Sequence, residues 1–246
     1  MIDKKGQVTI FIIIAILIVA FVVIFFMFRE SREIKEPFLI PESQLYAIKN
    51  SIDGCLEITA IDGIRLTGMQ GGYIFPPENS LETNLSTIAY GYYKGKNTLI
   101  PLDKMQNEIV SYVKLAMPLC FDEGMFEDLS ITSNDLNAEV KINSNSVSLL
   151  IDYPISITKE SATLILEEEY RTEIPIRLGK IHKKANELIE KEKENPLYIE
   201  LTYLTNSDYD ISILPYKKNV LIYSITDENS QIDDVPYTFI FANRLR

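Results

Sequence analysis

Histidine and cysteine are scarce in this sequence, and tryptophan is absent. The 246 residues include one histidine, His182, and two cysteines. A Ser-His-Asp or Cys-His catalytic group would have to use His182, which lies in a predicted helix beside two lysines. The HExxH, P-loop, GxGxxG and GxSxG motifs are also missing. These absences give no support to zinc proteolysis, nucleotide hydrolysis or α/β-hydrolase chemistry. We therefore predict no catalytic residues, no metal site and no cofactor.

Basic residues are fewer than acidic ones. The chain has 24 Lys and Arg against 35 Asp and Glu, a net charge of −11. A surface of this sign repels phosphate backbones, which argues against nucleic-acid binding. Acidic runs such as 167–169 leave open a carboxylate-dependent hydrolase, whose two carboxyl groups must lie about 5–10 Å apart across a cleft. A solvated acidic face explains these runs equally well.

One long hydrophobic run is present near the N-terminus. Residues 8–28 contain a single polar residue, Thr9, and at about 1.5 Å per residue they would span about 31 Å. This length matches the hydrocarbon core of a lipid bilayer, so we predict one transmembrane helix at 8–28. Lys4 and Lys5 precede the run. The positive-inside rule therefore predicts a cytoplasmic stub at 1–7 and an extracytoplasmic C-terminal part.

The residues around the start of this run carry a resemblance to a known family. Lys4-Lys5-Gly6-Gln7, followed by the apolar residues 8–12, resembles the N-terminus of an archaeal type IV pilin-like precursor. The resemblance covers residues 1–28 and implies that a dedicated peptidase cuts between Gly6 and Gln7. Pilins usually have a glutamate at the fifth mature position, where this chain has Phe11. The whole chain is also similar to single-pass surface proteins of small-genome archaea.

Two helices are expected after a stalk at residues 29–42. Helical spacing of apolar residues begins at Ser43, although glycines at 54, 63 and 68 argue against one unbroken helix. Gly71-Gly72 are expected to end it. Pro101 suits the first turn of a second helix. We therefore predict a helix-rich subdomain at 43–126.

The hydrophobic period changes from helical to alternating beyond Gly124. Alternation at 136–142 and 147–151 predicts a hairpin, and a charged helix is expected at 178–193. The runs 220–225 and 237–241 are apolar on both faces, which is typical of central strands. The pattern predicts an α+β fold: the transmembrane helix, two further helices, then a mainly antiparallel sheet with one helical insertion. Residues 127–246 would form a β-rich subdomain.

The two cysteines lie far apart in the sequence. Cys55 falls on the first predicted helix after the stalk, and Cys120 follows the next one. In an oxidising exterior we predict a disulfide between them, which would close a loop of 65 residues (120 − 55) and stabilise the fold by about 4 kcal/mol. The alternative is two independent buried thiols that pack as small apolar groups.

Two surface features are candidates for recognition or modification. The segment 69–77 combines paired glycines, two aromatics and two prolines, and we predict a stiff recognition loop that presents Tyr73 and Phe75. The alternative is a short strand in which both aromatic side chains pack inward. Asn84-Leu85-Ser86 forms an N-glycosylation sequon, with Asn84 as the acceptor.

Together these observations predict a membrane-anchored, pilin-like surface protein. Its ectodomain would be structural, adhesive or partner-binding. Its partners would be the lipid bilayer through residues 8–28, and either further copies of the chain or another protein at the cell surface. Two alternatives stay open: a membrane-tethered carboxylate-dependent hydrolase of extracellular polymer, and an accessory subunit of a membrane complex.

Overall fold

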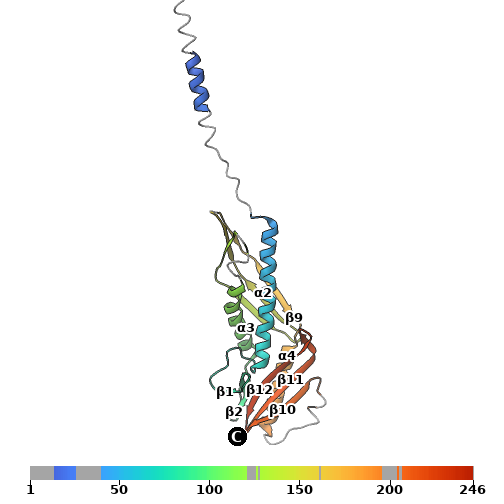
Figure 1. The fold of residues 1–246 in the computed structure, drawn as a ribbon. Coiled ribbons are helices and arrows are strands. Elements are labelled where there is room, and N and C mark those ends of the chain that lie inside the picture. Colours follow the sequence, from blue (N-terminus) through green and yellow to red (C-terminus); the bar gives the residue numbers. More distant parts are fainter. Residues whose placement is uncertain are drawn as a thin grey trace, which may run out of the picture. The chain divides into compact units, whose positions relative to one another are not determined.

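The computed structural model describes residues 14–25, 40–120, 126, 128–160, 162–195, 204 and 207–245 (Figure 1). The chain divides into two units, Met1–Ile40 and Pro41–Arg246, which are described separately. In the first unit, residues 14–25 are helical and exposed. The rest of the predicted span at 8–28, the stub at 1–7, the Gly6–Gln7 site and most of the stalk lie outside the described residues. Among the helices that the structure describes, none combines the length and the apolar character needed to cross a membrane.

The second unit has the predicted α+β architecture with mainly antiparallel sheets. Its described helices are α2 (Glu42–Met69), α3 (Leu102–Ala116), the 3-10 helix η1 (Met117–Cys120) and α4 (Leu178–Glu194). Its described strands are β1 (Ser80–Glu82), β2 (Thr87–Tyr93), β3 (Lys96–Asn97), β4 (Ser130–Ser133), β5 (Asn137–Ile142), β6 (Val147–Asp152), β7 (Ile155–Lys159), β8 (Ala162–Leu166), β9 (Glu169–Ile174), β10 (Asp210–Lys217), β11 (Val220–Ile232) and β12 (Val235–Arg244).

Helix α2 runs unbroken through the glycines that argued for an interruption. A Cβ on Gly68 would lie 2.6 Å from the carbonyl oxygen of Thr238, and one on Gly63 would lie 3.2 Å from the ring of Tyr112. These glycines therefore let the helix approach β12 and α3 closely, and the packing offsets their low helix propensity. The helix ends where predicted, since Gly71 and Gly72 adopt φ values of +71° and +91°.

The largest sheet joins residues from both halves of the second unit. Its strand order is β1-β2-β12-β11-β10, and β3 pairs with β2. Strand β12 pairs parallel to β2 and antiparallel to β11, so both C-terminal apolar runs are central strands, as predicted. Residues 43–126 and 127–246, which we expected as two subdomains, therefore share one sheet within one compact unit.

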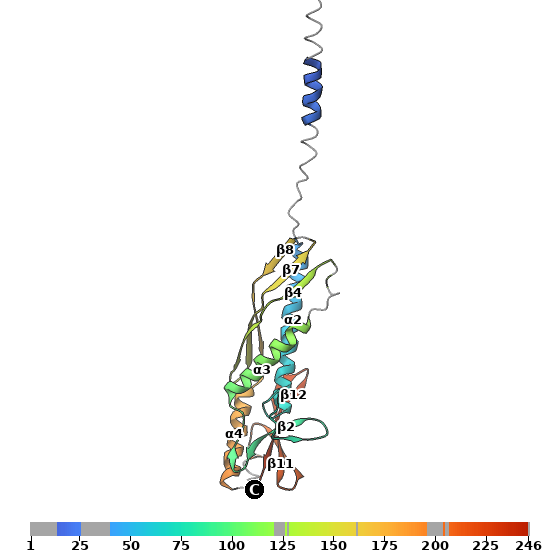
Figure 2. The same ribbon diagram turned by 90° about the vertical axis from the view of Figure 1, so that its left-hand side faces the viewer.

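Aromatic side chains on one face of this sheet form much of its core. Tyr237, Phe239 and Phe241 alternate along β12 and are all buried. The Tyr237 hydroxyl donates to the carbonyl of Ile64 in α2 (3.0 Å), and Phe241 packs with Ile189 of α4 around Gly91. Figure 2 shows α2 and α4 beside these strands. The helices thus hold the sheet through its aromatic face.

Two three-stranded antiparallel sheets complete the second unit. Their orders are β5-β6-β9 and β4-β7-β8. The predicted hairpin is present, with β5 and β6 paired from Asn137↔Asp152 to Ile142↔Val147. Its inward residues Val140, Val147, Leu149 and Ile151 are buried, which explains the alternation in the sequence. Helix α3 contacts β5, and α2 contacts β9.

Candidate functional site

The two cysteines are brought together as predicted. Their Cα atoms are 6.1 Å apart, within the range that disulfides span, and the sulfurs are paired. Cys55 lies on α2 and Cys120 ends η1, which follows α3 directly. A bond here would tie α2 to the end of α3 and hold the two helices in register.

The predicted recognition loop neither forms a strand nor turns both aromatics inward. Ile74 is buried, with an exposed fraction of 7%, whereas Phe75 at the next position is 50% exposed. Tyr73 is half-buried. Burial, together with the negative charge of Glu108, raises the pKa of the Tyr73 phenol, which keeps it neutral. Of the two predicted contact residues, Phe75 is therefore the one whose ring is exposed to solvent.

Glu108 of α3 holds this loop in place. Its Oε2 atom accepts hydrogen bonds from the backbone N–H groups of Ile74 (3.0 Å) and Phe75 (2.8 Å). Gly72 is equally constrained, because a Cβ there would lie 2.3 Å from Ile100 and 2.6 Å from Met105. Bonds to a carboxylate are among the stronger hydrogen bonds in proteins. The exposed ring of Phe75 therefore stands on a fixed backbone, which lowers the entropic cost of binding.

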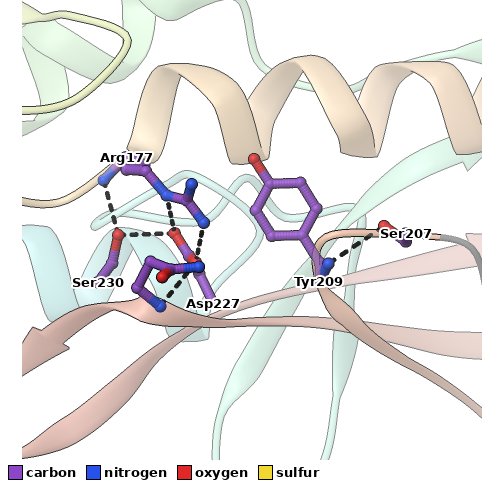
Figure 3. Close-up of polar contacts among 6 residues, drawn as sticks. Arg177, Ser207, Tyr209, Asp227 and Ser230 are labelled. Carbon is purple, nitrogen blue, oxygen red and sulfur yellow. Dashed lines mark hydrogen bonds and ion pairs between the residues drawn. The ribbon is translucent and has the colours of Figure 1, made fainter.

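A buried ion pair joins the start of α4 to β11 (Figure 3). Asp227 has a fully buried side chain, and it accepts bonds from Nε (2.8 Å) and Nη2 of Arg177. The Ser230 hydroxyl donates to Asp227 Oδ2 (2.6 Å), and the backbone N–H of Asn229 donates to Oδ1 (3.0 Å). The same serine oxygen accepts the backbone N–H of Arg177 (3.0 Å). The guanidinium lies beside the Tyr209 ring (Figure 3), and its carbon is 5.5 Å from the ring centroid.

These contacts define what the cluster can do chemically. Burial alone would raise the pKa of Asp227, but the bonds from Arg177, Ser230 and Asn229 lower it below its ordinary value. The carboxylate is therefore ionised and its lone pairs are occupied, which makes it a poor proton acceptor. The hydroxyl proton of Ser230 is likewise used in its hydrogen bond to Asp227. The cluster is built to fasten a helix to a strand, not to transfer protons.

The acidic run from Asp227 to Asp234 belongs mostly to a strand. Strand β11 continues to Ile232, a bulge follows Asp227, and the turn consists of Asp233 and Asp234 alone. The bulge lets Asp227 point inward, and its partner Arg177 lies 50 positions earlier in the sequence. Hydrophobic periodicity in the sequence cannot reveal a pair of residues so far apart.

A second buried carboxylate lies at the other end of α4. Glu192 is 7% exposed and its Oε2 accepts a hydrogen bond from Nδ2 of the buried Asn243. Tyr223 of β11 also bonds to Glu192. Burial raises the pKa of Glu192, and the bonds from Asn243 and Tyr223 only partly oppose this. The pKa of Tyr223 is raised as well, by burial and by the carboxylate beside it.

His182 and Asn84 occupy different environments. His182 is half-buried on α4, and its Nε2 lies 2.7 Å from the carbonyl oxygen of Ile100, so this nitrogen carries the proton and donates it. Burial lowers the pKa of His182, which favours the neutral ring.

Asn84 is exposed in the turn between β1 and β2. Thr83 Oγ1 shapes this turn by accepting the N–H groups of Leu85 (3.2 Å) and Ser86 (3.0 Å).

The face of the β5-β6-β9 sheet carries two carboxylates that bear on the hydrolase alternative. A hollow of about 320 Å³ is lined by Glu139 and Glu173 together with Lys141, Ser148 and Arg171. In the register, Glu139 shares a row with Arg171, and Glu173 shares a row with Lys141. Two strand spacings and a two-residue offset separate the carboxylate-bearing positions by about 12 Å. The intervening cations do not suit an acid/base pair, since Lys141 already pairs with Glu139 (2.9 Å).

No group of three or more His, Cys, Asp or Glu side chains gathers into a metal site within the described ranges. Comparisons of the chain with protein-family models, with curated proteins and with solved structures gave no match.

Proposed function

We propose that this chain is a membrane-anchored, pilin-like surface protein whose ectodomain binds a protein partner and has no catalytic activity. The apolar run at residues 8–28 and the lysines before it support the anchor and its orientation. The saturated contacts of Asp227 and the dispersed carboxylates of the β5-β6-β9 face support a binding role over a hydrolytic one.

The observation that carries the binding role is the presentation of Phe75. Its ring is half-exposed, while the backbone on which it stands is bonded twice to Glu108. Aromatic side chains on rigid supports are favoured at the centres of protein interfaces, because they bury a large area with little loss of entropy. Phe75 is therefore the expected anchor residue of the interface.

Surface proteolysis tests the location. Cells that express the full-length chain with a C-terminal epitope tag are treated with an impermeant protease. We expect the tag to be lost from intact cells while a cytoplasmic marker survives. A tag that stays protected until the cells are lysed would place the C-terminal part in the cytoplasm and overturn the proposal.

The cysteine pair gives an independent readout of the compartment. An oxidising exterior would keep Cys55 and Cys120 bonded, so native protein should react with an alkylating reagent only after reduction. Mass spectrometry of the protein with and without reductant measures this directly. Two alkylated cysteines without reductant would contradict an exterior location.

Site-specific photocrosslinking tests the interface. A photoreactive phenylalanine analogue is placed at position 75 or, as a matched control, at Leu85, which is 94% exposed on the β1–β2 turn. We expect a discrete protein adduct from position 75 and none from position 85. Substituting Glu108→Gln in the same protein should weaken the adduct, because the loop loses a charged acceptor. Equal adducts from both positions would indicate nonspecific contact.

A further inference from the structure

The two ends of the six-stranded sheet carry opposite charge. The turns β2–β3 and β10–β11 and the last residues of β12 lie at one end, because Val220 pairs with both Lys217 and Arg244, and Asn243 pairs with Tyr92. In Figure 1 this end lies at the C-terminus of the chain, near the labels of β2 and β10. We call its exposed cations the basic end: Lys94, Lys96, Lys217, Lys218 and Arg244.

The segments that carry the basic end contain no Asp or Glu, although Glu190 and Glu192 of α4 bond to Asn97 and Asn243 beside them. Residues 93–97, 215–220 and 243–245 include no Asp or Glu, in a chain with a net charge of −11. Within the described part of the chain, none of the five cations pairs with a carboxylate. Glu190 of α4 reaches β3 through Asn97, but it is already bonded to Asn97 and Lys193. These charges are therefore available to a partner.

The opposite end of the same sheet is acidic. The start of β10 pairs with Thr226, and beyond it the β11–β12 hairpin continues to its turn at Asp233 and Asp234. We call the exposed carboxylates there the acidic end: Asp208, Asp210, Glu228, Asp233 and Asp234. Among them Asp233 bonds to Arg65 of α2 (2.8 Å).

Apolar surface accompanies the charge at both ends. Beside the β11–β12 turn is a groove of about 230 Å³, lined by Arg65, Met69, Ile232, Val235, Pro236, Tyr237 and Thr238. Val235 at its rim is 64% exposed. Next to the basic end, Leu214 and Tyr216 stand on the same face of the edge strand β10, with exposed fractions of 58% and 38%. Each end thus has an apolar contact surface beside its charges.

We propose that the basic end of one copy of this chain binds the acidic end of the next copy, with Leu214 and Tyr216 against the groove. The two ends cannot meet within one molecule, because they lie at opposite ends of one sheet. Side-by-side contacts between copies with a net charge of −11 are repulsive, whereas this contact pairs opposite charges. A polyanion would account for the basic end alone and would leave the acidic end and its groove without a partner.

The contact joins two different surfaces, so it repeats head to tail. Such heterologous contacts build rings or open chains and are not limited to dimers. The association runs through the sheet, and it depends neither on the apolar N-terminal run nor on Phe75. It is therefore separate from the proposed function, which can fail or hold on its own tests.

Reciprocal charge reversal tests the contact. The full-length chain in a nonionic detergent is examined by sedimentation at about 50 mM and about 500 mM salt, where we expect association to weaken about tenfold on adding salt. The variant Lys217→Glu/Lys218→Glu should reduce the basic end from a net charge of +5 to +1, and Glu228→Lys/Asp234→Lys should reduce the acidic end from −5 to −1. Each variant alone should associate at least about tenfold more weakly than the wild type. Their mixture should associate again, since the intact acidic end of the first variant can bind the intact basic end of the second.

Controls and contrary outcomes are defined by the same assay. Lys104→Glu/Lys114→Glu makes the same charge change on the exposed face of α3 and should associate like the wild type. Lys94 already adopts a φ of 50°, so a lysine at position 234, with a φ of 61°, fits a backbone that this chain uses elsewhere. Thermal unfolding of each variant checks the fold. A wild type that stays monomeric at low salt, or variants that fail to rescue one another, would overturn the proposal. Binding of heparin by a monomeric wild type, lost in Lys217→Glu/Lys218→Glu, would assign the basic end to a polyanion instead.

Discussion

The two ends of α4 hold buried carboxylates in opposite ways. At its start Asp227 is paired with the guanidinium of Arg177 and has a lowered pKa. At its last turn, Glu192 has the neutral groups of Asn243 and Tyr223 as its partners among the described residues, and its pKa is raised. Both side chains are buried, so burial cannot explain the difference. The charge of the partner decides whether a buried carboxylate stays ionised.

The helix itself adds to this contrast. The N-terminus of a helix carries a partial positive charge and its C-terminus a partial negative one. Asp227 lies beside the first residues of α4, where an anion is favoured, and Glu192 lies within its last turn, where an anion is disfavoured. The dipole of α4 therefore favours the ionised form of Asp227 and disfavours the ionised form of Glu192. Substitutions at each end should act in opposite directions.

Replacing Arg177 should have the largest effect. Arg177→Met leaves Asp227 buried without its cation, which we expect to lower the free energy of unfolding at pH 7 by about 3 kcal/mol. Urea unfolding of the full-length chain measures this. Lys180→Met, an exposed substitution in the same first turn, should change stability by less than about 0.5 kcal/mol. Equal stability of the two variants would show that the ion pair does not fasten α4.

Replacing Asp227 should lower the stability less than replacing Arg177 does. The Arg177 side chain that remains is partly exposed, so water can hydrate it. Asp227→Asn should lower stability by about 2 kcal/mol at pH 7. A carboxylate with a lowered folded pKa stabilises above its ordinary pKa of 3.8 and loses this effect as the pH falls through the folded value. The wild-type advantage should therefore shrink as the pH falls below this ordinary value. An advantage that is constant with pH would contradict the role of the charge.

Replacing Glu192 should act in the opposite direction. Glu192→Gln removes a buried charge, and its new N–H groups can serve Asn243 Oδ1, which has no partner among the described residues. We expect a gain of about 1 kcal/mol at pH 8. The gain should vanish as the pH falls below the ordinary pKa of 4.5, where the carboxyl is protonated in both states. Glu194→Gln, exposed at the end of the same helix, should show no such pH-dependent gain.

The smallest effect is expected for Tyr223. Tyr223→Phe removes a hydroxyl that bonds to Glu192, so stability at pH 7 should fall by about 0.5–1 kcal/mol. Combined with Glu192→Gln the loss should be smaller, since the amide needs this donor less than an ion does. A double-mutant cycle read by urea unfolding measures the coupling. Strict additivity would mean that the hydroxyl does not support the carboxylate.

Elements with a strong local period were predicted closely. The helix expected at 178–193 is α4, the alternating runs at 136–151 form the β5–β6 hairpin, and the doubly apolar runs lie in the central strands β11 and β12. The glycines of α2 were misjudged as interruptions. Gly63 and Gly68 allow α2 to approach other elements closely, and these contacts are visible only in the structure.

The candidate functional features were harder to predict from the sequence, because the residues that contact one another are far apart along the chain. The Phe75 loop was proposed from its glycines and prolines, but Glu108, which fixes it, lies 33 positions later. Arg177 and Asp227 are 50 positions apart, and Glu192 and Asn243 are 51. Nothing in the local composition distinguishes Asp227 from its exposed neighbour Glu228.

The sequence by itself determined the α+β class, the main helices and hairpin, and the pairing proposed for Cys55 and Cys120. These follow from local periodicity and from the number of cysteines, which any fold of this chain must respect. Only the tertiary structure decided that β12 pairs parallel to β2, that the sheet has a basic and an acidic end, and that Asp227 is ionised while Glu192 resists ionisation. Strand pairing and electrostatics depend on which distant residues meet, and a local pattern does not contain that information.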